Sequence, residues 1–414
     1  MTDPLLEVEG LRVAFGDAEP VVRDVSFTLT PGRVLALVGE SGSGKSVSAM
    51  SLLGLLPPEA RVSGSARFRG EELIGADAEH LRAVRGAGIG VVFQEPMNSF
   101  TPVLTIGTQI AEAVRAHPTG LDRAGVSARI DELLRSAGLR DPERIRKAYP
   151  HELSGGQLQR AMIAMALAGD PVALISDEPT TALDVTVQAG ILDLLRTLGR
   201  ERSLAVLLIT HDMGVVADVA DEVLVMRRGD PVERGSVADV FARPQADYTR
   251  ELLAAVPALE ARITPAPSAA VGPTAGPQDA QSATPSAPAD ADDASGASRP
   301  VVARLRDVAV RYARRGEPTV SGIDLELHAG GTVGLVGESG SGKSTIGRAL
   351  AGLVPVVDGS VEVDGSDLRT ARGKRLRELR SRVGIVFQDP ASSLNPRQTI
   401  GWSIAEPLLV HDPR

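Results

Sequence analysis

A phosphate-loop pattern constrains the fold of this chain more than any other feature of its sequence. Val34–Val38 is a short apolar run of the kind found in buried parallel strands. It leads into Gly39–Ser46, which fits G-x-x-x-x-G-K-[ST] and precedes a segment that suits a helix. A glycine-rich turn without a ligand is the alternative. The strand, the helix and the Lys-Ser pair together favour a phosphate site in an α/β fold.

Each residue of the loop has a predicted role. Its glycines let successive backbone N–H groups point at an anion, and the following helix presents its positive end to the same phosphates. The lysine would reach the β and γ phosphates of ATP, and the serine hydroxyl would bind Mg²⁺. The predicted ATP-binding residues are Gly39, Ser41, Gly42, Gly44, Lys45 and Ser46.

The pattern occurs a second time, at Gly337–Ser344, and its flanks match as well. Because solenoids repeat every ~20–50 residues, this longer spacing indicates two homologous domains, predicted at residues 1–257 and 301–414. Residues 258–300 are rich in Ala, Pro, Ser and Asp and cannot bury a core, which predicts a disordered, extended linker. The second set of predicted ATP-binding residues is Gly337, Gly340, Gly342, Lys343, Ser344 and Thr345, with Ser344 also a metal ligand.

Composition excludes several classes of protein. The formal net charge of -9 argues against a general nucleic-acid binder. No run reaches the ~18 apolar residues that a membrane span needs, and the first residues lack the pattern of an export signal, so we expect a cytoplasmic location. The chain has no cysteine, which excludes disulfides, thiolate zinc sites and cysteine-held iron–sulfur clusters.

Polar side chains close three apolar, strand-like runs: Gln94 ends one, Asp177 and Glu178 end the next, and His211 follows a third. Open α/β sheets bind ligands at the carboxyl ends of their strands, so we expect these side chains beside the phosphate loop. Asp177 can hold Mg²⁺ through water, Glu178 can polarise an attacking water, and His211 can contact the γ phosphate. A structural salt bridge and a structural histidine are the alternatives.

Other segments have two interpretations each. Residues 5–30 read as antiparallel strands, in which Phe15 either stacks on an adenine ring or is a half-buried strand aromatic, with Tyr312 as its counterpart in the second copy. Residues 95–150 have a helical, charged pattern that suggests an insertion. Ser154 would cap the next helix, and Gly155 and Gly156 leave its first backbone N–H groups uncovered by side chains. This helix end is either a second anion site or only a support for the core.

Taken in order, these motifs resemble the nucleotide-binding subunit of an ABC transporter, with a match over about residues 5–257. The resemblance implies a P-loop NTPase fold of the ABC type, with an N-terminal antiparallel β subdomain, a helical insertion and a second, partial copy. It implies that Gln94 contacts the metal and the water, that Glu178 is the catalytic base and that His211 is the switch residue at the γ phosphate. It also implies that ATP is held between the phosphate loop of one domain and Ser154–Gly156 of another, with Asp184 crossing the interface.

A narrower resemblance comes from four segments and points to the dipeptide, oligopeptide and nickel uptake group, in a form that fuses both ATPase halves. It implies ATP and Mg²⁺ as cofactors, membrane permeases as partners, an extracytoplasmic solute-binding protein as an indirect partner, and a peripheral place on the cytoplasmic face of the membrane. No nucleic-acid partner is expected. Some members carry a cysteine cluster, which this chain lacks. The segments are Phe93–Ile110, Phe387–Gly401, Gly229–Gly235 and Pro244–Leu253.

The second copy ends after the segment of Gln388, which is its predicted ATP-binding and metal residue, and no second Leu-Ser-Gly-Gly-Gln, Asp-Glu pair or switch histidine follows. We therefore expect a truncated or split sequence, or a pair of chains whose first domains join head to tail. The second half should expose open sheet edges and apolar surface. Competing functions are a regulatory nucleotide-binding fragment and a soluble twin ATPase of translation or DNA repair.

Overall fold

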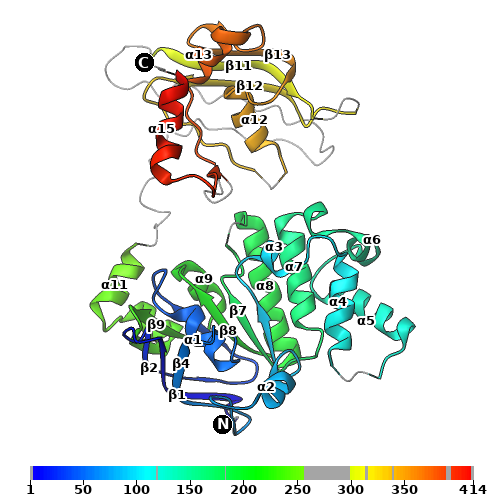
Figure 1. The fold of residues 1–414 in the computed structure, drawn as a ribbon, viewed down its shortest axis with the longest axis vertical. Helices are drawn as coiled ribbons and strands as arrows, with labels where there is room; N and C mark the ends of the chain where they lie inside the picture. Colours follow the sequence, from blue (N-terminus) through cyan, green and yellow to red (C-terminus); the bar gives the residue numbers. More distant parts are fainter. Residues whose placement is uncertain are drawn as a thin grey trace, which may run out of the picture. The chain divides into compact units, whose positions relative to one another are not determined.

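The computed structural model describes residues 3–117, 120–181, 183–255, 299–312, 316–337, 340–387 and 393–411. The chain divides into two compact units, residues 1–269 and 270–414 (Figure 1). The predicted linker lies outside the described residues except for its last two positions, and Gln388 lies outside them as well. Within the described ranges, no helix has both the length and the apolar character needed to cross a membrane.

The first unit begins with an antiparallel sheet, as predicted. Its strands lie in the order β2-β1-β4-β5. Residues that alternate along β1 and β2 are buried, because one face of this sheet packs on the core. The strands are β1 (Leu6–Phe15), β2 (Val22–Leu29), β4 (Ala60–Phe68) and β5 (Glu71–Glu72).

A six-stranded sheet follows, in the order β10-β9-β3-β8-β7-β6. Five of its strands are parallel, and only β10 runs antiparallel to its neighbour β9. Because both faces are covered, β3, β7 and β8 are buried along their whole length, which is why they read as unbroken apolar runs. The strands are β3 (Val34–Val38), β6 (Ile89–Val92), β7 (Ala173–Asp177), β8 (Ala205–Thr210), β9 (Glu222–Arg227) and β10 (Asp230–Ser236).

Alternate side chains of this sheet pack into different layers. Leu35 and Leu37 of β3 share a hydrophobic cluster with Leu52 of helix α1 (Lys45–Leu52) and with the antiparallel sheet. Val34 points the other way and packs with Leu158 of α7 (Gly155–Ala166). Helix α7 runs beside α8 (Val185–Arg202) (Figure 1). Helix α1 and helix α7 therefore lie on opposite faces of the central sheet.

The helical insertion predicted at residues 95–150 is confirmed. It comprises α3 (Pro96–Ser99), α4 (Ile106–Arg115), α5 (Arg123–Ser136), α6 (Pro142–Lys147) and a short 3-10 helix, Pro150–Glu152. Its apolar residues join the cluster on the α7 face of the sheet. The other helices of this unit are α2 (Ala78–Val84), α9 (Met213–Val219), α10 (Val237–Ala242) and α11 (Asp247–Ala254).

The second unit repeats the start of the first. Its antiparallel sheet has the order β12-β11-β13-β14, which matches β2-β1-β4-β5, and a helix again follows its phosphate loop. The elements are β11 (Val301–Val310), β12 (Val320–His328), α12 (Lys343–Leu350), β13 (Val356–Val363), β14 (Ser366–Asp367), α13 (Gly373–Arg380) and α15 (Ile400–His411).

The repeat differs from the first unit in one respect, because residues 332–337 form no strand where β3 lies in the first unit. In the first unit β3 is hydrogen-bonded to β8 and β9, and β6 to β7. The described part of the second unit has no counterpart of β7, β8 or β9, so these backbone groups have no strand to pair with. The expected apolar exposure is confirmed: Val336 is 98% and Val386 99% exposed.

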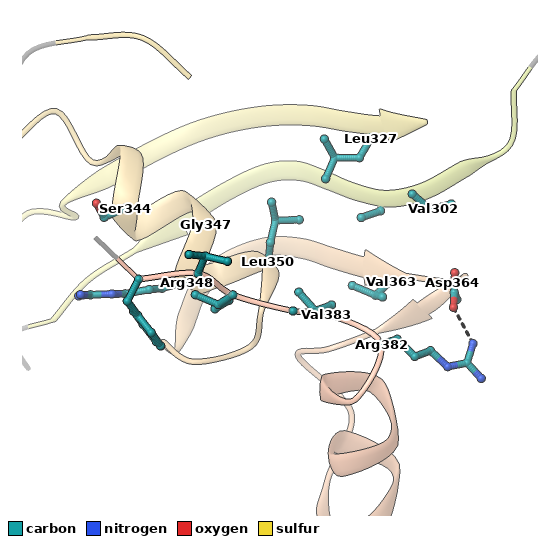
Figure 2. A pocket seen from close by; sticks show the side chains of 15 residues that line it. Val302, Leu327, Ser344, Gly347, Arg348, Leu350, Val363, Asp364, Arg382 and Val383 are labelled. Atoms are coloured by element: carbon teal, nitrogen blue, oxygen red, sulfur yellow. Dashed lines mark hydrogen bonds and ion pairs between the residues drawn. The ribbon is translucent and has the colours of Figure 1, made fainter. Parts of the chain in front are cut away.

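A cavity of about 770 Å³ lies in the second unit (Figure 2). Val302, Leu327 and Val363 line it from the sheet, Leu350 from α12, and Val383 from the coil that follows α13. In the first unit the matching faces of α1 and of the antiparallel sheet pack against β3, β7 and β8. The cavity thus lies where a central sheet fills the space in the first unit.

Candidate functional site

The first phosphate loop, residues 39–46, requires glycine at two positions. Gly39 has φ 154° and Gly44 has φ 95°, and both lie where L side chains are rare. A Cβ atom on Gly39 would lie 2.1 Å from the carbonyl oxygen of Met226, and one on Gly44 would lie 2.7 Å from that of Val21. The loop therefore packs directly against neighbouring backbone. Ser41 and Gly42 are exposed at its tip.

Lys45 is 5% exposed and its ammonium lies inside the loop. The Nζ atom donates hydrogen bonds to the carbonyl oxygens of Gly39 and Glu40, each at 2.8 Å. Burial lowers the pKa of Lys45, and the negative charges of Glu178 and Asp177 oppose this shift. The lysine is thus a partly desolvated cation close to two carboxylates, and its binding of phosphate stays a prediction.

Ser46 and Asp177 meet across the strand ends. The Ser46 Oγ donates a hydrogen bond of 3.0 Å to Asp177, which is 5% exposed, and burial raises the pKa of that carboxyl group. Among the described residues no cluster of three or more His, Cys, Asp or Glu could hold a metal by itself. Mg²⁺ binds hard oxygen ligands and is commonly completed by water and substrate phosphates. The hydroxyl and carboxylate fit that donor set.

Glu178 is the centre of a polar cluster built from three strand ends. Its carboxylate accepts a 2.9 Å hydrogen bond from Gln94 Nε2 and lies 3.2 Å from the Nδ1 atom of His211. Thr181, a residue that sequence reasoning missed, donates its hydroxyl at 2.9 Å. The only signal for Thr181 was its spacing of three from Glu178 in the turn after β7. The cluster arises because β6, β7 and β8 are parallel neighbours, so their carboxyl ends meet at one edge.

The start of α7 has the cap that the sequence predicts. The Ser154 side chain accepts a 3.3 Å hydrogen bond from the Gln157 N–H, and Gln157 Oε1 accepts a reciprocal bond from the Ser154 N–H. A Cβ atom on Gly156 would lie 2.4 Å from Val187, so α7 and α8 begin side by side. Asp184 caps α8 through the Val187 N–H at 3.0 Å.

The structure therefore brings Ser154, Gly155, Gly156 and Asp184 together where α7 and α8 begin. Helix α7 packs on the face of the central sheet opposite to α1. Anion binding by the start of α7 stays a prediction.

The two aromatic candidates differ in their surroundings. Phe15 is half-buried and packs against the core beneath the antiparallel sheet. Tyr312 is 52% exposed, and its hydroxyl lies 3.3 Å from Thr345 Oγ1 of α12. Tyr312 thus contacts the phosphate-loop helix of the second unit. Stacking of either ring on adenine stays a prediction.

The described glycines of the second phosphate loop have nearly the same backbone angles as their counterparts in the first. Gly342 has φ 92°, close to the 95° of Gly44, and Gly337 has φ 157°, close to the 154° of Gly39; Gly340 is also left-handed. The Lys343 Nζ donates a hydrogen bond to the Gly337 carbonyl at 2.7 Å. Thr345 is buried, whereas Ser344 is exposed at the edge of the cavity (Figure 2).

The sequence matches the ABC transporter family over residues 22–181 and 320–405. The chain belongs to the ABC transporter family. With this membership come ATP binding and ATP hydrolysis, which are the chemistry of its nucleotide-binding subunits. The match spans both phosphate loops.

Relatives with assigned names cover nearly the whole chain. A peptidoglycan transport ATP-binding protein (YejF) of Agrobacterium fabrum is 46% identical over 99% of this chain and 72% of its own length. An oligopeptide transport ATP-binding protein (OppD) of Mycobacterium tuberculosis is 43% identical, over 98% of this chain and 76% of its own. A glutathione import ATP-binding protein (GsiA) of Escherichia coli is 44% identical, over 98% and 67%.

Solved structures show the same fold in one of the two units. The structure of cbiO1 from Clostridium perfringens, part of the ABC transporter complex cbiONQ, has a TM-score of 0.52 and 29% identity, over 58% of this chain and 92% of that one. The dimeric ATP-binding cassette MJ0796 with ADP and Pi has a TM-score of 0.50 and 26% identity, over 56% and 98%.

Proposed function

We propose that this chain is the ATP-hydrolysing subunit of an importer that takes up peptides or similar small solutes through a separate membrane permease. The observation that carries the proposal is the position of Glu178, held between Gln94 and His211 at strand ends next to Lys45. The named relatives act on peptidoglycan, oligopeptides and glutathione, all of which contain peptide units. The soluble twin-ATPase alternative has no comparable support.

In this proposal, Glu178 is the general base that takes a proton from the water attacking the γ phosphate. Gln94 and His211 hold its carboxylate through the hydrogen bonds described above and would orient the water and the phosphate. Lys45 and its loop bind the β and γ phosphates. Ser46 and Asp177 would hold Mg²⁺, with Gln94 beside them, and the ion would neutralise phosphate charge.

A second ATPase domain is a necessary partner in this proposal. Ser154–Gly156 begin α7, which packs on the face of the central sheet opposite to α1, and we infer that they contact nucleotide bound to another domain. MJ0796, one of the structural neighbours, is a dimer. We infer that the first units of two chains, or of this chain and another subunit, close over ATP with the start of α7 of one against the loop of the other.

The permease is proposed to dock beside Gln94. A groove of about 440 Å³ there is lined mainly by apolar side chains, among them Leu55, Ile89, Phe93 and Met165. Phe93 is 41% exposed and directly precedes Gln94, so a helix seated in the groove would move with the catalytic cluster. In this proposal the chain would be a peripheral subunit on the cytoplasmic face of the membrane, and an extracytoplasmic solute-binding protein would act on it only through the permease.

The test compares Glu178→Gln with Glu201→Gln, which removes a carboxylate from the exposed surface of α8. We expect Glu178→Gln to lower the rate of ATP hydrolysis by about 10²–10⁴-fold, because the general base is lost, while Glu201→Gln leaves the rate unchanged. Light scattering of the Glu178→Gln chain with Mg²⁺-ATP should show a doubling of mass, because blocked hydrolysis traps the closed pair.

One result would contradict the proposed role of Glu178, and a second would decide between the two closing partners. Equal hydrolysis by the native chain and by Glu178→Gln would remove Glu178 from the mechanism and favour a regulatory nucleotide-binding role. A chain that binds ATP and loses hydrolysis on Glu178→Gln, but stays monomeric, would instead point to a different ATPase subunit as the closing partner.

A further inference from the structure

Helix α11 contacts the phosphate loop from a position more than two hundred residues further along the chain. The hydroxyl oxygen of Tyr248, on α11, accepts a 3.1 Å hydrogen bond from the backbone N–H of Glu40, the second residue of the loop. Tyr248 is 3% exposed, which makes it one of the most buried aromatic side chains among the described residues. The segment Pro244–Leu253 was singled out in the sequence only as a mark of a transporter group.

Tyr248 is fixed in place by the elements around it. The guanidinium of Arg227, at the end of β9, lies 4.5 Å from the centre of its ring. The carboxylate of Glu233, on β10, accepts hydrogen bonds from the N–H groups of Gln245 and Ala246 at 2.8 and 3.0 Å, which fastens the start of α11. The hydroxyl group therefore reaches the loop from a rigid support on β9 and β10.

The same loop residue is held from its other side by the phosphate-binding lysine. The carbonyl oxygen of Glu40 accepts a hydrogen bond from Lys45 Nζ at 2.8 Å, while its N–H is bonded to Tyr248. Without the hydroxyl, that N–H would lose its partner and the peptide could rotate. The peptide that carries the Glu40 N–H also carries the Gly39 carbonyl, which accepts a second 2.8 Å hydrogen bond from Lys45 Nζ, so the ammonium would shift with that peptide.

We propose that Tyr248 is a positioning residue that holds the Glu40 peptide, and through it Lys45, in the geometry that binds nucleotide phosphates. This inference rests on the proposed ATP site in the first unit. A loop that already has its binding conformation binds more tightly, because ATP does not have to select that conformation from several. The segment that follows the ATPase core is thereby part of the nucleotide site.

The experiment measures the affinity of the full chain for a fluorescent ATP analogue. All variants carry Lys343→Ala, which disables the second loop so that only the first reports. We expect Tyr248→Phe to raise Kd about three- to tenfold, because the ring and its packing remain and only the hydroxyl is lost. In steady-state hydrolysis the same variant should raise KM for ATP by a similar factor and change kcat less than twofold. Tyr149→Phe, from a tyrosine that is 39% exposed, is the matched control and should leave Kd unchanged.

A second variant tests the support rather than the hydroxyl. Glu233→Ala releases the start of α11, so it should raise Kd as Tyr248→Phe does, and the double variant should be no weaker than the worse single one, because both act through one contact. A Kd for Tyr248→Phe within twofold of its parent, or fully additive effects, would overturn the inference. Failure of the Lys343→Ala parent to bind ATP would overturn the proposed function itself.

Discussion

At the scale of single residues, the backbone of Glu178 is the most informative feature. It has φ 44°, a left-handed conformation that costs a non-glycine residue of order 1–3 kcal/mol. Its N–H donates to the carbonyl of Ile209 on β8, and its carboxylate is 14% exposed within the Gln94–His211 cluster. The strain turns the side chain out of the strand and into the site. Such positions concentrate at active sites, which agrees with the role proposed for Glu178.

Asp177 provides a prediction about pH. Burial raises the pKa of Asp177, so near the ordinary carboxyl pKa and above it the folded chain holds a proton more tightly than the unfolded chain does. The contribution of this group to stability therefore falls as pH rises through that window, and at pH 7 its buried charge is a net cost. We expect Asp177→Asn to melt at a higher temperature than the native chain at pH 7, with the difference shrinking as pH falls toward 4.

The same variant should lower the affinity of the site for Mg²⁺ by about 10- to 100-fold, because a ligand that holds the ion through water is lost. Half-maximal hydrolysis should then need a correspondingly higher Mg²⁺ concentration. Asp193→Asn, whose parent side chain is 76% exposed, is the control for both measurements. Thermal melts from pH 4 to 8 and Mg²⁺ titrations of ATPase rate give the two readouts. A native chain and variant with superimposable pH profiles would show that the buried carboxylate carries no such cost.

At the scale of elements, one arginine joins three helices. Arg160 of α7 donates hydrogen bonds of 3.0 Å to the carbonyl oxygens of Ala137, after α5, and Gly190, within α8. Burial lowers its pKa. Two glycines leave room for the guanidinium: a Cβ atom would lie 2.4 Å from it on Gly138 and 2.8 Å on Gly190. The Arg160 slot, formed by Arg160, Gly138 and Gly190, holds the helical insertion, α7 and α8 together.

Because of this slot, we expect Gly190→Ala to change stability in the opposite direction from the same replacement in an ordinary helix. In an ordinary helix Gly190→Ala would stabilise by up to about 1 kcal/mol. Here we expect it to destabilise, because the new methyl group displaces the guanidinium. Arg160→Ala should cost about 1–3 kcal/mol, because two hydrogen bonds from a charged donor to part-buried carbonyl oxygens are lost, and Arg160→Lys should cost less. Urea unfolding measures these changes, and Arg200→Ala on the exposed side of α8 is the control. A stabilised Gly190→Ala chain would contradict the role of the slot.

At the scale of the whole molecule, the two units differ in how much of their apolar surface is covered. The first unit has a sheet buried on both faces, whereas the second exposes Val336, Val386 and Phe387 and contains the 770 Å³ cavity. The second unit should therefore unfold first. Scanning calorimetry of the full chain should show two transitions. Val361→Ser, at a buried position of β13 in the second unit, should lower the midpoint temperature of only the first transition.

The matched control for this prediction is Val386→Ser. Because that side chain is 99% exposed, its replacement should change neither transition by more than about 0.5 kcal/mol and should reduce aggregation at high protein concentration. A single cooperative transition that Val361→Ser shifts as a whole would show that the units unfold together.

Local pattern was sufficient for much of this protein. The phosphate loops depend on glycine conformations and on one lysine within a few residues, so the sequence by itself determined their place and their turn. The buried strand before the first loop, the cap at Ser154 and the helical insertion also follow from short-range periodicity and spacing. The polar residues at strand ends could be expected to meet, because parallel strands share an edge.

Only the tertiary structure decided the rest. Thr181 reaches Glu178, and Tyr248 reaches Glu40, through the order of strands and the docking of α11, which no local pattern contains. Residues 332–337 show that a local pattern can also fail. A similar apolar run forms β3 in the first unit, but these residues form no strand in the second. The physical reason is that a strand takes its hydrogen bonds from its neighbours, so a strand-like sequence becomes a strand only where other strands lie beside it.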